Sequence, residues 1–87
     1  MKFDSTTVNV EGKEIVIAAV DTNFFTMQPQ DQMAIVRGFF EFFGKQVVCM
    51  GVNSQGDMQY FGRPDLTNLV SGLKFSEFQW TTNEIAD

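Results

Sequence analysis

The stretch PQDQMAIVRGFFEFFG, residues 29–44, decides the fold because it specifies one helix from its first residue to its last. Pro29 suits the first turn of a helix, where its missing N–H would be unpaired in any case. Asp31 adds a negative charge where the helix dipole favours one. Gly44 suits the left-handed residue that ends a helix, and Lys45 follows it. The stretch therefore predicts a helix that begins at Pro29 and stops at Gly44.

The apolar side chains of this helix cover about half of its circumference when residues are placed about 100° apart. They are Met33, Ile35, Val36, Phe39, Phe40, Phe42 and Phe43. The other half carries Ala34, Arg37, Gly38 and Glu41. An apolar arc of this width exceeds what one contact with a sheet usually needs. We therefore expect part of it to form an interface, unless the second helix and the loop at 24–27 cover it.

Strand patterns lie on both sides of the helix. The predicted strands are residues 7–10, 14–20, 46–53, 58–61 and, in the tail, 75–82. A second helix is expected to begin near Pro64, because Leu66, Leu69, Val70 and Leu73 form one apolar stripe. The prediction is a small single α+β domain over residues 1–87, in the order β-β-α-β-β-α-β. We expect an antiparallel or mixed sheet with both helices packed on one face, and a frayed tail at 83–87.

Composition and charge narrow the classes of function. The chain has a net charge of −5, and its six Lys and Arg residues form no run. Nucleic-acid binding normally needs a basic patch, so it is disfavoured even though Tyr60, Phe61 and Arg63 could resemble part of an RNA-binding sheet. The acidic residues are scattered too, which favours solubility over imitation of DNA. No apolar run is long enough for a secretory signal or a membrane span, so we expect a cytoplasmic protein without membrane contact.

Catalytic and metal-binding patterns are weak. The chain has no His and a single Cys, which removes the commonest general base and excludes zinc sites built from thiolate and imidazole. Cys49 lies in an apolar run and is predicted to be a buried, reduced thiol. The spacing Asn53-x-Gln55-x-Asp57 lacks the Gly and Glu of a calcium loop and predicts a hairpin loop. Arg63 and Asp65 are assigned to the electrostatics of a helix end. We therefore expect no enzyme, no cofactor and no metal.

A protein-interaction module is the hypothesis that remains. It would be a small non-enzymatic adaptor or inhibitor, of a type common among accessory proteins of phages and mobile elements. We expect another protein as its partner, with a homodimer as the simplest assembly. The candidate interface residues are Met33, Phe40, Phe24, Phe25, Phe78 and Trp80. A ligand-binding or enzymatic domain with a site of dispersed carboxylates is the first alternative, and nucleic-acid binding is the second.

Overall fold

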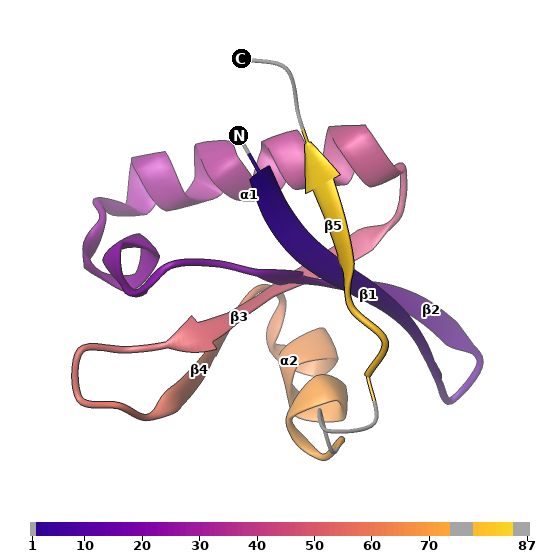
Figure 1. Ribbon diagram of the computed structural model, residues 1–87. Helices are drawn as coiled ribbons and strands as arrows, with labels where there is room; N and C mark the ends of the chain where they lie inside the picture. The colour runs from indigo at the N-terminus through magenta and orange to yellow at the C-terminus, as the bar shows by residue number, and fades with distance from the viewer. Residues whose placement is uncertain (1, 74–77, 85–87) are drawn as a thin grey trace.

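The computed structural model describes residues 2–73 and 78–84 and confirms both the α+β class and the predicted order of elements. A five-stranded mixed sheet with the strand order β4-β3-β2-β1-β5 is accompanied by two α-helices (Figure 1). The elements are β1 (Lys2–Val10), β2 (Lys13–Ala19), the 3-10 helix η1 (Thr22–Thr26), α1 (Pro29–Phe43), β3 (Gln46–Val52), β4 (Met58–Phe61), α2 (Pro64–Ser71) and β5 (Thr81–Glu84).

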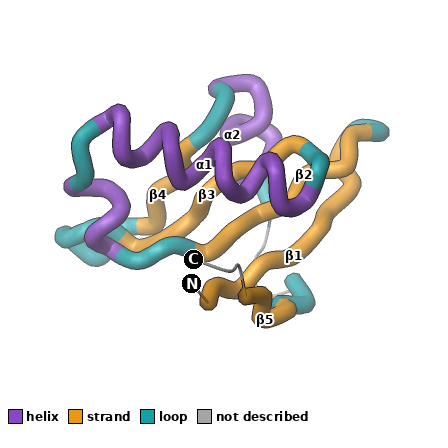
Figure 2. The backbone as a smooth tube through the Cα atoms, turned by 90° about the horizontal axis from the view of Figure 1, so that it is seen from above, coloured by secondary structure: helices purple, strands orange, loops and turns teal. Residues whose placement is uncertain are grey.

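The sheet is built from two antiparallel parts joined by one parallel pair. Figure 2 shows the strands side by side in their order across the sheet. β1 pairs antiparallel with both β2 and β5, and β3 pairs antiparallel with β4. β1 and β2 form a hairpin whose two turn residues, Glu11 and Gly12, both have positive φ, as a two-residue turn that matches the strand twist requires. β2 and β3 run parallel, and such a pair needs a long crossover, which η1 and α1 provide.

The two helices lie on opposite faces of the sheet, so the prediction that both pack on one face is wrong (Figure 1). The physical reason lies in the two central strands. Residues 15–18 of β2 and 47–50 of β3 are buried at every position, whichever face the side chain points to. A strand covered on one side alternates between apolar and polar residues, whereas a continuous apolar run must be covered on both. α1 covers one face and α2 covers the other.

Helix α1 has the ends that the sequence predicts. Pro29 occupies the first turn, and Gly44 closes the helix with a left-handed backbone, φ 65°. The backbone N–H of Gly44 donates to the carbonyl of Phe40 at 2.8 Å. The side of α1 that faces the sheet is centred on Phe39, which is 1% exposed and whose ring centroid lies 4.6 Å from that of Phe3.

The segment at 24–27, expected to be a loop on the core, is mostly 3-10 helix. Phe24 points into the core at 2% exposure, and its ring centroid lies 5.2 Å from that of Phe61. Its backbone carbonyl accepts a hydrogen bond at 2.9 Å from Nε2 of Gln32, a buried polar side chain of α1. The same carbonyl accepts the backbone N–H of Met27 at 3.2 Å, so the bond from Gln32 is a second one, and it ties η1 to α1.

The outer strands differ most from the prediction. β1 begins at Lys2 rather than at residue 7, because its first half pairs with β5. The tail strand spans Thr81–Glu84 rather than 75–82, so residues 83 and 84, expected to fray, are paired. Nδ2 of Asn83 donates to Oγ of Ser5 at 2.6 Å. These polar segments lack the apolar alternation from which strands are recognised. Residues 75–77 and 85–87 of the predicted tail lie outside the described residues.

Candidate functional site

Nucleophilic chemistry at Cys49 and metal binding receive no support from the side chains that the structure describes. Cys49, predicted to be buried, is fully buried in β3, and burial raises the pKa of its thiol to about 12. The thiol is therefore protonated at neutral pH, while the reactive form of a cysteine is the thiolate. No group of three or more His, Cys, Asp or Glu within residues 2–73 and 78–84 could hold a metal ion.

The loop at 53–57 has the hairpin role that its sequence predicts. Oδ1 of Asn53 accepts hydrogen bonds from the backbone N–H of Gln55 at 2.9 Å and from that of Asp57 at 3.0 Å. This side-chain oxygen, which a cation would need as a ligand, is thus occupied in closing the turn between β3 and β4.

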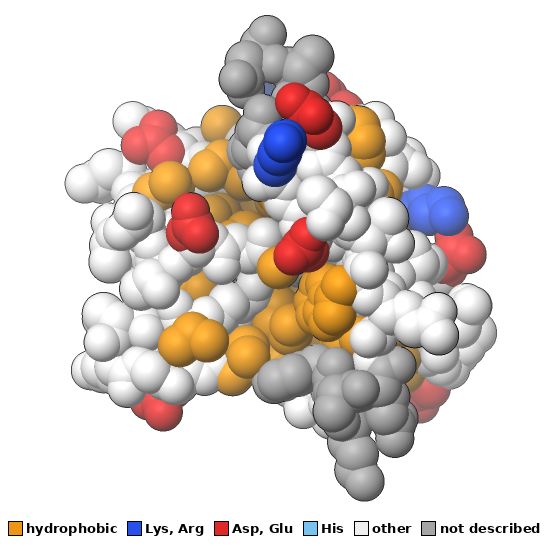
Figure 3. Space-filling view, in the orientation of Figure 1, with side chains coloured by type: hydrophobic (Ala, Val, Ile, Leu, Met, Phe, Trp, Pro, Cys, Tyr) orange, Lys and Arg blue, Asp and Glu red, His pale blue; other side chains and the backbone are white. Residues whose placement is uncertain are grey.

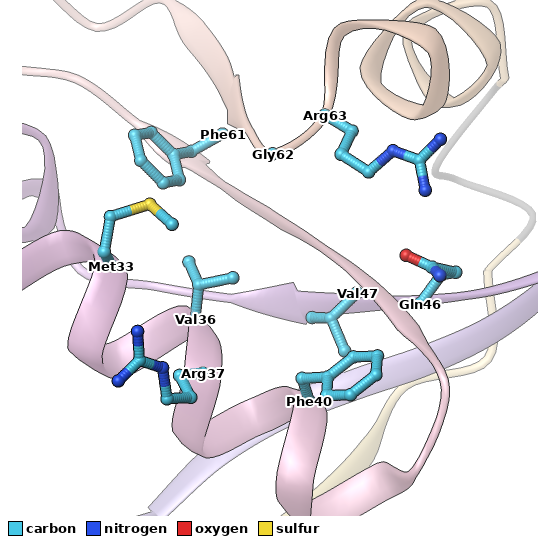
Figure 4. A pocket seen from close by; sticks show the side chains of 9 residues that line it. All are labelled: Met33, Val36, Arg37, Phe40, Gln46, Val47, Phe61, Gly62 and Arg63. Carbon is cyan, nitrogen blue, oxygen red and sulfur yellow. The ribbon is translucent and has the colours of Figure 1, made fainter.

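A groove between α1 and the end of β4 is the candidate site, and we call it the α1 groove (Figure 4). Its cavity volume is about 420 Å³. The lining residues are Met33, Val36, Arg37 and Phe40 from α1, Gln46 and Val47 from the start of β3, and Phe61, Gly62 and Arg63 from the end of β4 and the turn into α2. The volume lies within the range of cavities that accept small molecules or the side chains of a partner.

Helical spacing places one wall of the groove, and strand pairing places the other. Residues 33, 36, 37 and 40 follow the spacing i, i+3, i+4, i+7, which puts them on one face of α1. Val47, only 6% exposed, lies at the start of β3 beneath them. β4 runs antiparallel to β3 in a register that pairs Phe61 with Cys49. Phe61 and the turn that follows it therefore come to lie opposite α1.

The α1 side of the groove carries apolar surface that the chain itself does not cover. Met33 is 53% exposed and Phe40 is 47% exposed. These two residues form one margin of the wide apolar arc of α1, while Phe39 takes the buried centre. Phe42 forms the other margin at 46% exposure, outside the groove. Since buried apolar surface is stabilising at roughly 25 cal/mol per Å², a partner that covers Met33 and Phe40 would gain free energy.

Two arginines approach the groove from opposite sides (Figure 4). Arg37 comes from α1 and has no ion-pair partner among the described residues. Arg63 comes from the turn before α2, and its Nη2 lies 3.0 Å from Oδ2 of Asp65 in a solvent-exposed pair. Among the residues that the structure describes, no Asp or Glu lines the groove, although the chain as a whole has a net charge of −5. The groove is thus a locally basic site in an acidic protein.

The six residues predicted for an interface do not form one surface. Met33 and Phe40 lie together in the α1 groove. Phe24 is in the core, and Phe25 is half-buried against it, because η1 folds both rings toward the α1 face of the sheet. Phe78 packs against the core on the α2 face, and its ring centroid lies 5.9 Å from that of Trp80, which is 38% exposed. Phe24 is therefore too buried to contact a partner, and the other five residues do not share one surface.

Sequence reasoning missed the charged part of the groove. The helical pattern puts Arg37 on the polar half of the helix, next to Met33. The position of Arg63 before Pro64 predicts a role at a helix end. The ion pair of Arg63 with Asp65 exists as predicted, yet Arg63 also faces the groove. Only the β3–β4 hairpin brings the two arginines to one cavity, and no local pattern reports such a contact.

On the face shown in Figure 3 the Asp and Glu side chains stand singly, with hydrophobic patches between them. In the part of the chain that the structure describes, no helix has the length and apolarity needed to cross a membrane. No family model, curated protein or solved structure matches this chain. The function is therefore inferred from the residues of the groove.

Proposed function

We propose that this chain is a small non-enzymatic protein-interaction module that binds a partner through the α1 groove. The observation that carries the proposal is the half-exposed pair Met33 and Phe40 on the wall of an apolar cavity of about 420 Å³. Large exposed apolar side chains around a cavity are typical of interaction sites, where a few buried anchors contribute most of the binding free energy. The cytoplasmic location expected from the sequence stays a prediction.

Rigid support favours this use of the groove. Phe40 follows Phe39, which is fixed in the core against Phe3, and Val47 belongs to a buried central strand. A wall held by the core loses little conformational freedom on binding, so more of the contact energy appears as affinity. The protonated Cys49 thiol and the lack of His in the sequence weigh against the enzymatic alternative.

A display selection tests the proposal. The purified protein is used to select from a library of random peptides about twelve residues long, a length that spans three turns of a helix or a short strand. The Phe40→Glu variant is used in parallel. Phe42→Glu is the matched control, because the two rings are almost equally exposed on the same helix and only Phe40 lines the groove.

The proposal expects peptides with apolar anchors that bind the wild type and the Phe42→Glu variant but not the Phe40→Glu variant. If no peptide is enriched, or if Phe42→Glu removes binding while Phe40→Glu does not, the groove is not the interaction site. Light scattering gives the molar mass of the three proteins. If the wild type and Phe42→Glu are dimers and Phe40→Glu is a monomer, the partner is a second copy of the chain.

A further inference from the structure

We infer that the segment that docks in the α1 groove is acidic and amphipathic, with a bulky apolar side chain flanked by carboxylates. This inference rests on the proposed function and adds the chemistry of the partner. The apolar side chain would lie between Phe40 and Phe61, and the carboxylates would reach Arg37 and Arg63 at the two sides. The charge of the lining residues, positive in a negative protein, is the observation that carries the inference.

Arg37 is the clearest part of this charge pattern. It has no carboxylate partner among residues 2–73 and 78–84, although the chain carries eleven Asp and Glu against six Lys and Arg. Lys45, by contrast, pairs with Glu14 at 2.7 Å. A guanidinium presents a planar fork of N–H donors that fits a carboxylate with two parallel hydrogen bonds. Arg37 is therefore available to a carboxylate from outside the chain.

Arg63 can serve in the same way despite its bond to Asp65. The side chains of the pair are 64% and 47% exposed, so the interaction is screened by solvent. Exposed ion pairs of this kind stabilise a fold very little, and their partners exchange readily. A second carboxylate could therefore approach the free side of the Arg63 guanidinium without a large loss elsewhere.

The open shape of the groove favours a polypeptide over a small amphipathic acid. Small-molecule sites usually enclose most of the ligand surface. Here Met33 and Phe40 remain about half exposed, so the walls cannot close over a lone molecule. A segment of a folded or folding partner brings its own covering surface, and its backbone spaces the apolar and acidic groups on both sides of the cavity.

The charge of the selected peptides tests the inference separately from the proposed function. The same random peptide library is selected on the wild type and on the double variant Arg37→Gln/Arg63→Gln. The double variant Lys2→Gln/Lys13→Gln is the control, since it removes the same charge outside the groove lining. We expect Asp and Glu to be enriched on the wild type and on the lysine control, and the enrichment to be lost on the arginine variant.

Affinity measurements on the most enriched peptide complete the test. A twin peptide replaces its Asp and Glu with Asn and Gln, and fluorescence anisotropy gives all affinities. Each neutralised arginine should weaken the acidic peptide about two- to fivefold, as expected for a partly exposed ion pair, and both together about tenfold. The twin should bind wild type and arginine variant alike. The lysine variant should bind the acidic peptide as the wild type does.

Three outcomes would overturn the inference. Peptides that are not enriched in Asp and Glu, but that fail to bind the Phe40→Glu variant, would agree with the proposed function and contradict the acidic partner. Enrichment in Lys and Arg would show that the partner segment is positively charged rather than acidic. Displacement of the peptide by decanoate, dependent on both arginines, would make the occupant a small amphipathic acid rather than a polypeptide. A library that yields no binder at all would contradict the proposed function itself.

Discussion

Truncation of the adjacent residues Phe39 and Phe40 of α1 should change stability by very different amounts, and this is the sharpest test of how the helix is oriented. Phe39 is 1% exposed and Phe40 is 47% exposed. Phe39→Ala removes a ring that packs 4.6 Å, centroid to centroid, from Phe3 and leaves a cavity in the core. Phe40→Ala removes a ring whose outer half already contacts water.

The difference in free energy of unfolding should be large. Truncation of a fully buried Phe costs about 3–5 kcal/mol. At Phe40 only about half of the ring's transfer free energy is lost, or about 1 kcal/mol, and the better helix propensity of Ala returns part of it. A domain of 87 residues has about 4–13 kcal/mol in total, at roughly 0.05–0.15 kcal/mol per residue. Phe39→Ala therefore removes a large share of the stability, and Phe40→Ala removes little.

Urea unfolding followed by circular dichroism and by Trp80 fluorescence measures both losses, with equal m-values as the check on two-state behaviour. If Phe39→Ala does not fold, Phe39→Leu gives the same ranking with a loss of about 1–2 kcal/mol. Equal losses for the two positions, or a larger loss at Phe40, would refute the orientation of α1. The α1 groove would then lose its exposed wall.

Three further predictions concern other parts of the fold. Gly44→Ala should cost about 1 kcal/mol because of its positive φ, whereas Gly38→Ala, with no atom near the added carbon, should stabilise by about 0.5–1 kcal/mol; urea midpoints that shift in the same direction would contradict one of the two. Gln32→Glu should cost about 1–3 kcal/mol at neutral pH, because a carboxylate cannot donate to the Phe24 carbonyl, and acidification should restore part of it; a loss that does not change with pH would point to another cause. The thiol of Cys49, with its pKa raised by burial from 9.0 to about 12, should resist iodoacetamide in the folded protein and react in urea. Its contribution to stability is complete below about pH 9 and declines as pH rises toward 12, because the unfolded thiol ionises first; rapid labelling of the native protein would show that β3 is accessible.

Local rules account for what the sequence predicts well. The ends of α1 depend on a proline, an acidic residue and a glycine within one continuous stretch, and the structure places them as expected. The same holds for the hairpin loop closed by Asn53, whose side-chain oxygen accepts two backbone N–H groups of its own turn. Such features depend on neighbours in the chain, so they can be predicted without knowledge of the tertiary fold.

The sequence contains a signal that the two helices lie on opposite faces of the sheet. Ile15-Val16-Ile17-Ala18 and Val47-Val48-Cys49-Met50 are apolar at both odd and even positions. A strand of that composition needs cover on two faces, and two helices are what the chain has to provide it. The pairing of β5 with the start of β1, in contrast, joins polar segments from opposite ends of the chain, which no periodicity predicts.

The site was half predictable for a related reason. The width of the apolar arc of α1 identifies Met33 and Phe40 as marginal residues, and both are exposed. The same arc does not distinguish them from Phe42 on the other margin. The groove forms beside Met33 and Phe40 because the turn after β4 lies opposite them. The position of that turn depends on the long-range register between β3 and β4.

An acidic protein can bind an acidic segment because its charge is not distributed uniformly over its surface. At physiological ionic strength the Debye length is about 8 Å, so charges farther than this from the groove are largely screened. The described residues of the groove lining include two arginines and no carboxylate. The net charge of −5 therefore has little effect on an acidic segment at the groove, while Arg37 and Arg63 favour its binding at contact. A basic peptide would instead be drawn to the scattered acidic residues outside the groove, and its binding should not depend on Phe40.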